Sequence, residues 1–169
     1  MTSLTRLGLT AFALSAALSS AASATDYLTG GVAYYDVFDD QNATAFNLEY
    51  RGNYLFYDMI RPIVGGFYTT DGASYGYVGF NWDVPVIKNH LYIIPGFAVG
   101  AYSKGDDGKD LGGALEFRSS VEVAYQFENS HRLGISLSHL SNASLYDDNP
   151  GVELVTATYS IPLSSIFAK

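Results

Sequence analysis

The chain contains 169 residues, which is enough for one domain. It has no cysteine, and this excludes a disulfide framework, thiol chemistry and a cysteine-ligated metal site. Its 17 acidic residues outnumber its 9 basic residues and give a net charge of −8, which argues against nucleic-acid binding because that function needs a basic surface.

The first 24 residues have the features of a secretory signal peptide. Arg6 supplies positive charge, residues 7–18 form a short apolar stretch, and Ala22-Ser23-Ala24 fits the small-x-small rule for cleavage. The alternative, a retained membrane anchor, is weaker because the apolar stretch falls short of the ~20 residues that a spanning helix needs. We expect cleavage after Ala24, which leaves residues 25–169 as a single β-barrel domain.

After the predicted cleavage site, apolar residues recur at every second position. In residues 116–127 the odd positions are mainly Phe, Val and Tyr, whereas the even positions are mainly charged or small. This period of two is typical of a β-strand, and residues 45–51 repeat it. The same pattern predicts strands near residues 26–35, 44–51, 60–69, 74–84, 90–102, 115–127, 131–141 and 152–162.

The predicted connections differ in length. Those after the first, third, fifth and seventh strands are acidic or rich in Gly or Asn, whereas residues 87–89 and 128–130 are tight turns. Outer-membrane barrels have short periplasmic turns, longer extracellular loops and girdles of aromatic residues, and this chain has 14 Tyr and 10 Phe. We therefore predict an all-β fold, namely an eight-stranded antiparallel transmembrane β-barrel of the outer-membrane type. The connection at residues 52–58 is longer than this scheme expects.

A water-soluble barrel of the lipocalin kind is the alternative architecture. It would turn the apolar faces inward and expose Glu49, Arg51, Arg118 and Glu122 to solvent. In a membrane barrel these four side chains would instead face the lumen, which side chains fill when there are only eight strands. Paired Glu and Arg side chains there predict a polar plug and not a pore.

The last two strands carry the strongest chemical signal. His139, Ser141 and Glu153 all occupy odd positions, on the outward face near the extracellular end. An antiparallel register that pairs His139 with Glu153 also pairs Ser141 with Gly151, and directly opposed Cβ atoms lie within ~5.5 Å of each other. These residue types suit a nucleophile, a base and an orienting acid. The alternative is that they are ordinary polar residues of the barrel rim.

The segment His139-Leu140-Ser141-Asn142-Ala143, followed by Asn149-Pro150-Gly151-Val152-Glu153, resembles the PagL family of lipid A 3-O-deacylases. The closing segment at residues 159–163 also resembles that family. The resemblance implies a serine esterase in the outer membrane of a Gram-negative bacterium. It would remove the ester-linked 3-hydroxyacyl chain from position 3 of lipid A.

By motif position, the resemblance assigns Ser141 as the nucleophile, His139 as the base and Glu153 as the orienting acid. It assigns Asn149 and the backbone around Ser144 to the oxyanion hole, with Asn142 as a further motif residue of the oxyanion and substrate-binding set. The family usually has a small residue, often Gly, near position 144. Ser144 departs from that pattern but keeps the backbone donor.

The implied partner is lipid A or lipopolysaccharide in the outer leaflet. The protein would be embedded in the membrane, either as a monomer or as a homodimer. No metal or cofactor is implied, because ester hydrolysis by a Ser-His-Glu set needs only an oxyanion hole and water. Two rival functions are a non-enzymatic structural or adhesion barrel and a phospholipase on the same scaffold.

Three other signals have simpler readings. Residues 72–76 match G-x-S-x-G, but that motif is catalytic only in a strand-to-helix turn, and here it falls in a hairpin loop. His90 and His131 lie beside tight turns without a carboxylate at metal-ligand spacing. The acidic residues of 104–110 lack the closing Glu of an EF-hand and are read as a solvated loop.

Overall fold

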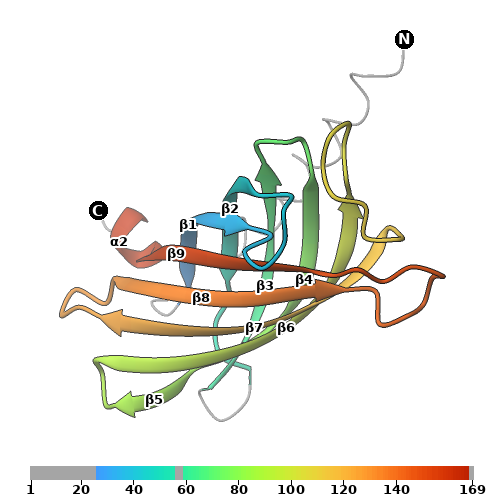
Figure 1. The fold of residues 1–169 in the computed structure, drawn as a ribbon. Helices are drawn as coiled ribbons and strands as arrows, with labels where there is room; N and C mark the ends of the chain where they lie inside the picture. The colour runs from blue at the N-terminus through green and yellow to red at the C-terminus, as the bar shows by residue number, and fades with distance from the viewer. Residues whose placement is uncertain (1–25, 56–58, 168–169) are drawn as a thin grey trace.

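The computed structural model describes residues 26–55 and 59–167, so the predicted signal peptide lies outside the described residues. In this part of the chain there are nine strands and one short helix (Figure 1). Their bounds are β1 Tyr27–Tyr35, β2 Ala43–Arg51, β3 Ile60–Thr69, β4 Ser74–Trp82, β5 Val84–Ile87, β6 Leu91–Ser103, β7 Leu115–Gln126, β8 Arg132–Ser141, β9 Val152–Pro162 and α2 Leu163–Phe167. Within these ranges, no helix has the length and apolarity to cross a membrane.

The strands close into an eight-stranded barrel, in which β4 and β5 together form one of the eight strands. Neighbouring strands pair antiparallel in the order β4-β3-β2-β1-β9-β8-β7-β6-β5, and a further pairing between β4 and β6 closes the sheet. β5 continues β4 after Asp83 and also pairs with β6. The predicted eight-stranded barrel is thus confirmed, except that the strand predicted at 74–84 is interrupted. The interruption coincides with Asp83, whose buried carboxylate forms ion pairs with Arg61 and Arg132.

The two ends of the barrel differ as predicted. The tight turns between β5 and β6 and between β7 and β8 lie at the end opposite the long β8–β9 loop (Figure 1). Each tight turn contains one left-handed residue, Asn89 at φ 65° or Ser130 at φ 65°. Helix α2, which was not among the predicted elements, follows β9 at the turn end. It is held there by a hydrogen bond of 2.9 Å from the Leu163 N–H to the Asp26 carbonyl.

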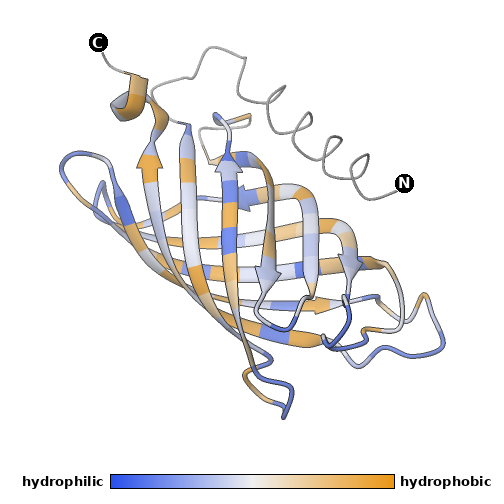
Figure 2. Cartoon of the chain, turned by 90° about the horizontal axis from the view of Figure 1, so that it is seen from above, coloured by the Kyte–Doolittle hydropathy of each residue, from blue (hydrophilic) through white to orange (hydrophobic). Residues whose placement is uncertain are grey.

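The barrel presents its apolar side chains outward. Hydrophobic and hydrophilic residues alternate along the strands (Figure 2). In β8, for example, Ile135 and Leu137 are exposed whereas Ser136 and Ser138 are buried. This polarity suits a bilayer and is the reverse of the lipocalin-like alternative, which is therefore wrong.

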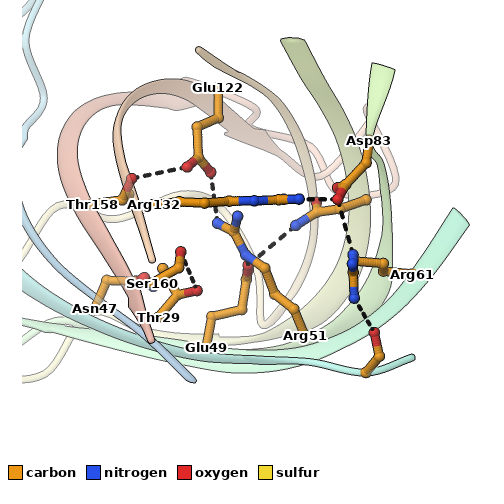
Figure 3. Close-up of polar contacts among 12 residues, drawn as sticks. Thr29, Asn47, Glu49, Arg51, Arg61, Asp83, Glu122, Arg132, Thr158 and Ser160 are labelled. Carbon is orange, nitrogen blue, oxygen red and sulfur yellow. Dashed lines mark hydrogen bonds and ion pairs between the residues drawn. The ribbon is translucent and has the colours of Figure 1, made fainter. Parts of the chain in front are cut away.

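Ion pairs fill the lumen, as Figure 3 shows. Arg51 donates to Glu49 at 2.7 Å and to Glu122 at 2.6 Å, and Arg118 lies 3.8 Å from Glu49. A second group joins Asp83 to two further arginines (Figure 3). The cavity among these polar side chains measures about 10 Å³, no more than about one water molecule. The lumen is a polar plug, and its ion pairs hold the walls together from inside.

The Arg51 pairs should dominate the stability of the plug. Replacing Arg51 by Leu leaves two buried carboxylates without their main cation, and we expect the free energy of unfolding to fall by about 3–5 kcal/mol. Urea unfolding of the barrel in detergent measures this change. Lys104→Leu is the control, because its ion pair with Asp110 is exposed and should contribute less than ~1 kcal/mol. Equal losses in the two variants would contradict the assignment.

Candidate active site

The β8–β9 ladder brings His139 and Glu153 together. The two residues are directly paired in the antiparallel register, as predicted, and both side chains lie on the outward face. His139 Nδ1 lies 2.7 Å from Glu153 Oε1. The imidazole is 46% exposed and the carboxylate 29% exposed. Since a carboxylate can only accept, Nδ1 donates in this hydrogen bond and Nε2 of the neutral ring is the free base.

Ser141 is the last residue of β8 and lies on the same face, two residues beyond His139. It is half-buried. A Cβ placed on Gly151 would lie 2.9 Å from His139 Cε1 and 3.6 Å from Nε2, so the free edge of the ring faces the end of the hairpin where Ser141 lies. In the described part of the chain, no hydrogen bond joins the Ser141 hydroxyl to His139. Contacts between a nucleophile and its base often tighten only when substrate binds.

Gly151 leaves the ladder one residue earlier than predicted. The pairing of β8 with β9 ends at Leu140 and Val152, so the expected pair of Ser141 with Gly151 is not part of it. Gly151 has φ +67°, a conformation that glycine adopts without the steric cost of a Cβ. The bend and the missing side chain together make room for the imidazole of His139.

A tight turn follows the candidate nucleophile. Ala143 and Ser144 are left-handed, at φ 54° and 60°, and the Leu145 N–H donates to the Asn142 carbonyl at 3.1 Å. Two central residues with positive φ define a type I′ turn. Glycine would adopt this conformation more readily than Ser144 does, because it has no Cβ. Within the described residues, the Ser144 N–H donates no hydrogen bond.

The two asparagines of the motif have different surroundings. Asn142 is fully buried, and its side-chain amide donates at 2.8 Å to the carbonyls of both Leu111 and Asp148. Its backbone N–H donates to Asn149 Oδ1 at 2.9 Å. Asn149 is exposed, so its Nδ2 remains available to a ligand. Asn142 therefore holds the loops together, while Asn149 keeps a donor at the surface.

Sequence reasoning missed two residues behind this site, Asp36 and Lys109. The Asp36 N–H donates to the Glu153 carbonyl at 2.8 Å, and Lys109 Nζ lies 2.8 Å from Asp36 Oδ1. Burial alone would lower the pKa of Lys109, but the hydrogen bonds and charges of Asp36 and Asp39 outweigh it and raise that pKa. The local sequence gives no sign that Lys109 is buried whereas Lys104 is exposed. The difference comes from a partner 73 residues away.

The other sequence signals remain structural. Residues 72–76 run from the β3–β4 turn, where Gly72 has φ +96°, into the start of β4, and the motif has no following helix. His90 stacks on Tyr125, and His131 Nδ1 lies 2.9 Å from the Tyr159 hydroxyl. Across residues 26–55 and 59–167 there is no group of three or more His, Asp or Glu side chains that could hold a metal ion.

Comparisons with known proteins identify a family. The family model described as "Lipid A 3-O-deacylase (PagL)" matches residues 29–162. The lipid A deacylase PagL of Bordetella bronchiseptica is 26% identical over 159 residues, which cover 85% of this chain and 89% of that protein. The lipid A deacylase PagL of Pseudomonas aeruginosa is 33% identical over 73 residues, or 43% of this chain and 42% of that protein.

Solved structures share the barrel. The crystal structure of the outer membrane enzyme PagL matches with a TM-score of 0.63 and 21% identity, over 80% of this chain and 99% of that one. Neisserial surface protein A matches with a TM-score of 0.58 and 12% identity, over 85% of this chain and 99% of that one. These two likenesses show the fold alone, whereas the family model spans most of the sequence. The chain therefore belongs to the PagL family of lipid A 3-O-deacylases, ester hydrolases of the Gram-negative outer membrane.

Proposed function

We propose that this chain removes the ester-linked 3-hydroxyacyl chain at position 3 of lipid A with Ser141 as nucleophile, His139 as base and Glu153 as orienting acid. The observation that carries the proposal is the 2.7 Å hydrogen bond between His139 and Glu153 on the outward face, beside Ser141. Three polar side chains on a lipid-facing surface are costly unless they have a use. A lipid substrate reaches this surface from within the outer leaflet and never needs the filled lumen.

The reaction follows acyl transfer to serine and then to water. His139 Nε2 takes the proton of Ser141 Oγ as that oxygen attacks the ester carbonyl, and Glu153 stabilises the resulting imidazolium. Collapse of the tetrahedral intermediate breaks the ester C–O bond, and the imidazolium gives its proton to the departing sugar oxygen, which leaves as a hydroxyl group. Water then attacks the acyl-serine by the same steps and releases the 3-hydroxy fatty acid. This chemistry uses side chains and water, without a cofactor.

We assign the oxyanion hole to Asn149 Nδ2 and the Ser144 N–H. Both donors are free of other hydrogen bonds within the described chain, and both lie in the loop that follows Ser141. Donors fixed before the reaction stabilise the developing negative charge without a reorganisation cost. Asn142 acts behind them, because it ties the loop to the Leu111 and Asp148 carbonyls.

The fatty chain of the substrate has a matching surface on the outside of the barrel. An apolar hollow lies toward the periplasmic side of the triad on β8, β9, β1 and β2. Its outward side chains and glycine are Leu28, Gly30, Val32, Leu48, Leu133, Ala157, Tyr159 and Ile161. Ala157 follows Glu153 by four residues, or ~13 Å along the strand. The triad and the hollow belong to one chain, so a homodimer is compatible with the proposal but is not needed for it.

The triad is tested by expressing the chain in a Gram-negative host and measuring lipid A by mass spectrometry. The wild-type chain should remove one 3-hydroxyacyl group, and Ser141→Ala or His139→Ala should abolish that loss. Asn149→Ala should reduce kcat by about 10²–10³-fold, as removal of an oxyanion donor does in other hydrolases. Unchanged lipid A with an inserted wild-type barrel would favour the structural rival. Accumulation of lysophospholipid would favour the phospholipase.

Gly151→Ala tests the fit of the imidazole. The new Cβ would lie 2.9 Å from His139 Cε1 and would also strain a backbone at φ +67°. We expect kcat to fall by about tenfold or more, equivalent to about 1.4 kcal/mol of transition-state stabilisation. Gly76→Ala is the matched control, since a Cβ there meets nothing within 4 Å. Equal activity of the two variants would argue against the assigned position of His139.

Gly30→Leu tests the acyl surface. A Cβ at Gly30 also meets nothing within 4 Å, so a larger side chain fits and fills the hollow. We expect activity on long-chain esters to fall relative to short-chain esters of the same head group. Deacylation of a series of chain lengths in detergent measures the ratio. Gly76→Leu is the control, because Gly76 lies on β4 away from the hollow, and it should leave this activity ratio unchanged. An unchanged ratio in Gly30→Leu would mean that the acyl chain of the substrate binds elsewhere.

A further inference from the structure

The main chain of Glu153 is held by the β1–β2 loop. The Asp36 N–H donates to the Glu153 carbonyl at 2.8 Å, and the Val37 N–H donates to the same oxygen at 3.3 Å. Asp36 can do this because it adopts a left-handed conformation, at φ 60°, directly after β1. That conformation is unfavourable for a residue with a Cβ and persists only where the surroundings fix it.

A buried ion pair fixes Asp36. Its side chain is completely buried, and Lys109 Nζ lies 2.8 Å from Oδ1. Oδ2 has no hydrogen-bond partner in the described residues, so Lys109 supplies the side-chain contact of this carboxylate. Lys109 also lies 3.0 Å from the exposed Asp39, and its own carbonyl accepts a hydrogen bond of 2.7 Å from the Tyr102 hydroxyl. Lys109 is thus held at its carbonyl by Tyr102 of β6 and at its ammonium group by two carboxylates of the β1–β2 loop.

The loop that carries Lys109 also holds the other half of the site. Two residues further on, the Leu111 carbonyl accepts a hydrogen bond from the side chain of Asn142, the residue after Ser141. Gly112 packs so closely on the β8–β9 loop that a Cβ there would lie 2.0 Å from the Asp148 carbonyl oxygen. Residues 109–112 therefore contact Asp36, which holds the main chain of Glu153, and also Asn142, which follows Ser141.

From these contacts we infer that Lys109 is a positioning residue for deacylation, which sets the place of Glu153 relative to His139 and Ser141 through its ion pair with Asp36. This inference rests on the proposed function, because it needs Glu153 to act in the triad. Lys109 is buried and acts through Asp36. Its loss should therefore alter the chemical step and leave substrate binding on the outer surface unchanged.

A double-mutant cycle with Glu153 separates positioning from general support. The full-length chain is refolded in detergent as wild type, Lys109→Met, Glu153→Gln and the double variant, and kcat and KM are measured on purified lipid A in mixed micelles. We expect Lys109→Met to lower kcat by about tenfold with KM within about twofold, the pattern of a lost transition-state interaction. In the Glu153→Gln background the same substitution should change kcat by less than about twofold, because the interaction it supports is already gone.

Lys104→Met is the matched control, since Lys104 lies in the same loop with an exposed ion pair and should keep kcat within about twofold of wild type. Where Lys109→Met fails to form the heat-modifiable band of a folded barrel, Asp36→Asn replaces it, because that change keeps the backbone donor and removes the charge. It should lower kcat severalfold, again only when Glu153 is present. Unchanged kcat in a folded variant, or equal losses in both backgrounds, would overturn the inference. Activity that survived Ser141→Ala would instead remove the proposed function itself.

Discussion

Everything in this molecule depends on the pairing of backbone groups in a closed antiparallel ladder. In hydrocarbon an unpaired N–H or C=O group costs several kcal/mol, so a spanning sheet must have no free edge. The pairing of β4 with β6 closes the sheet and thereby fixes the register of every neighbouring strand. Because successive side chains alternate between faces, that register also decides which residues meet. His139 meets Glu153 on the outside for the same reason that Arg51 meets Glu49 and Glu122 inside.

Because the sheet is closed, its inner and outer faces have different roles. The lumen carries buried ion pairs that hold the walls together, and it leaves no passage for a substrate. The outer face carries the hydrophobic side chains that match the bilayer, together with the polar group at its extracellular end. The loops at that end connect the two regions, since Asn142 and Lys109 are buried and yet bond to segments that carry the site.

Alternation in the sequence predicted the strands, their outward faces and the pairing of His139 with Glu153, because these follow from a period of two and a fixed register. The break at Asp83 could not be predicted in this way, since it coincides with ion pairs to arginines on β3 and β8. The buried place of Asn142 was hidden for a similar reason, because its partner Leu111 is 31 residues away. Local pattern specifies local geometry, whereas contacts between distant loops appear only once the barrel has closed.

The exposed position of His139 and Glu153 on the bilayer face has a consequence for kinetics. If the proposed triad is the site of hydrolysis, enzyme and substrate meet by diffusion in the plane of one leaflet. The relevant substrate variable is then the mole fraction of lipid A in that leaflet and not its concentration in solution. Dilution of cells in medium would leave the rate unchanged, whereas dilution of lipid A with other lipids or detergent would lower it. The fatty acid product would then be released into the same leaflet, where it would compete for the same apolar surface.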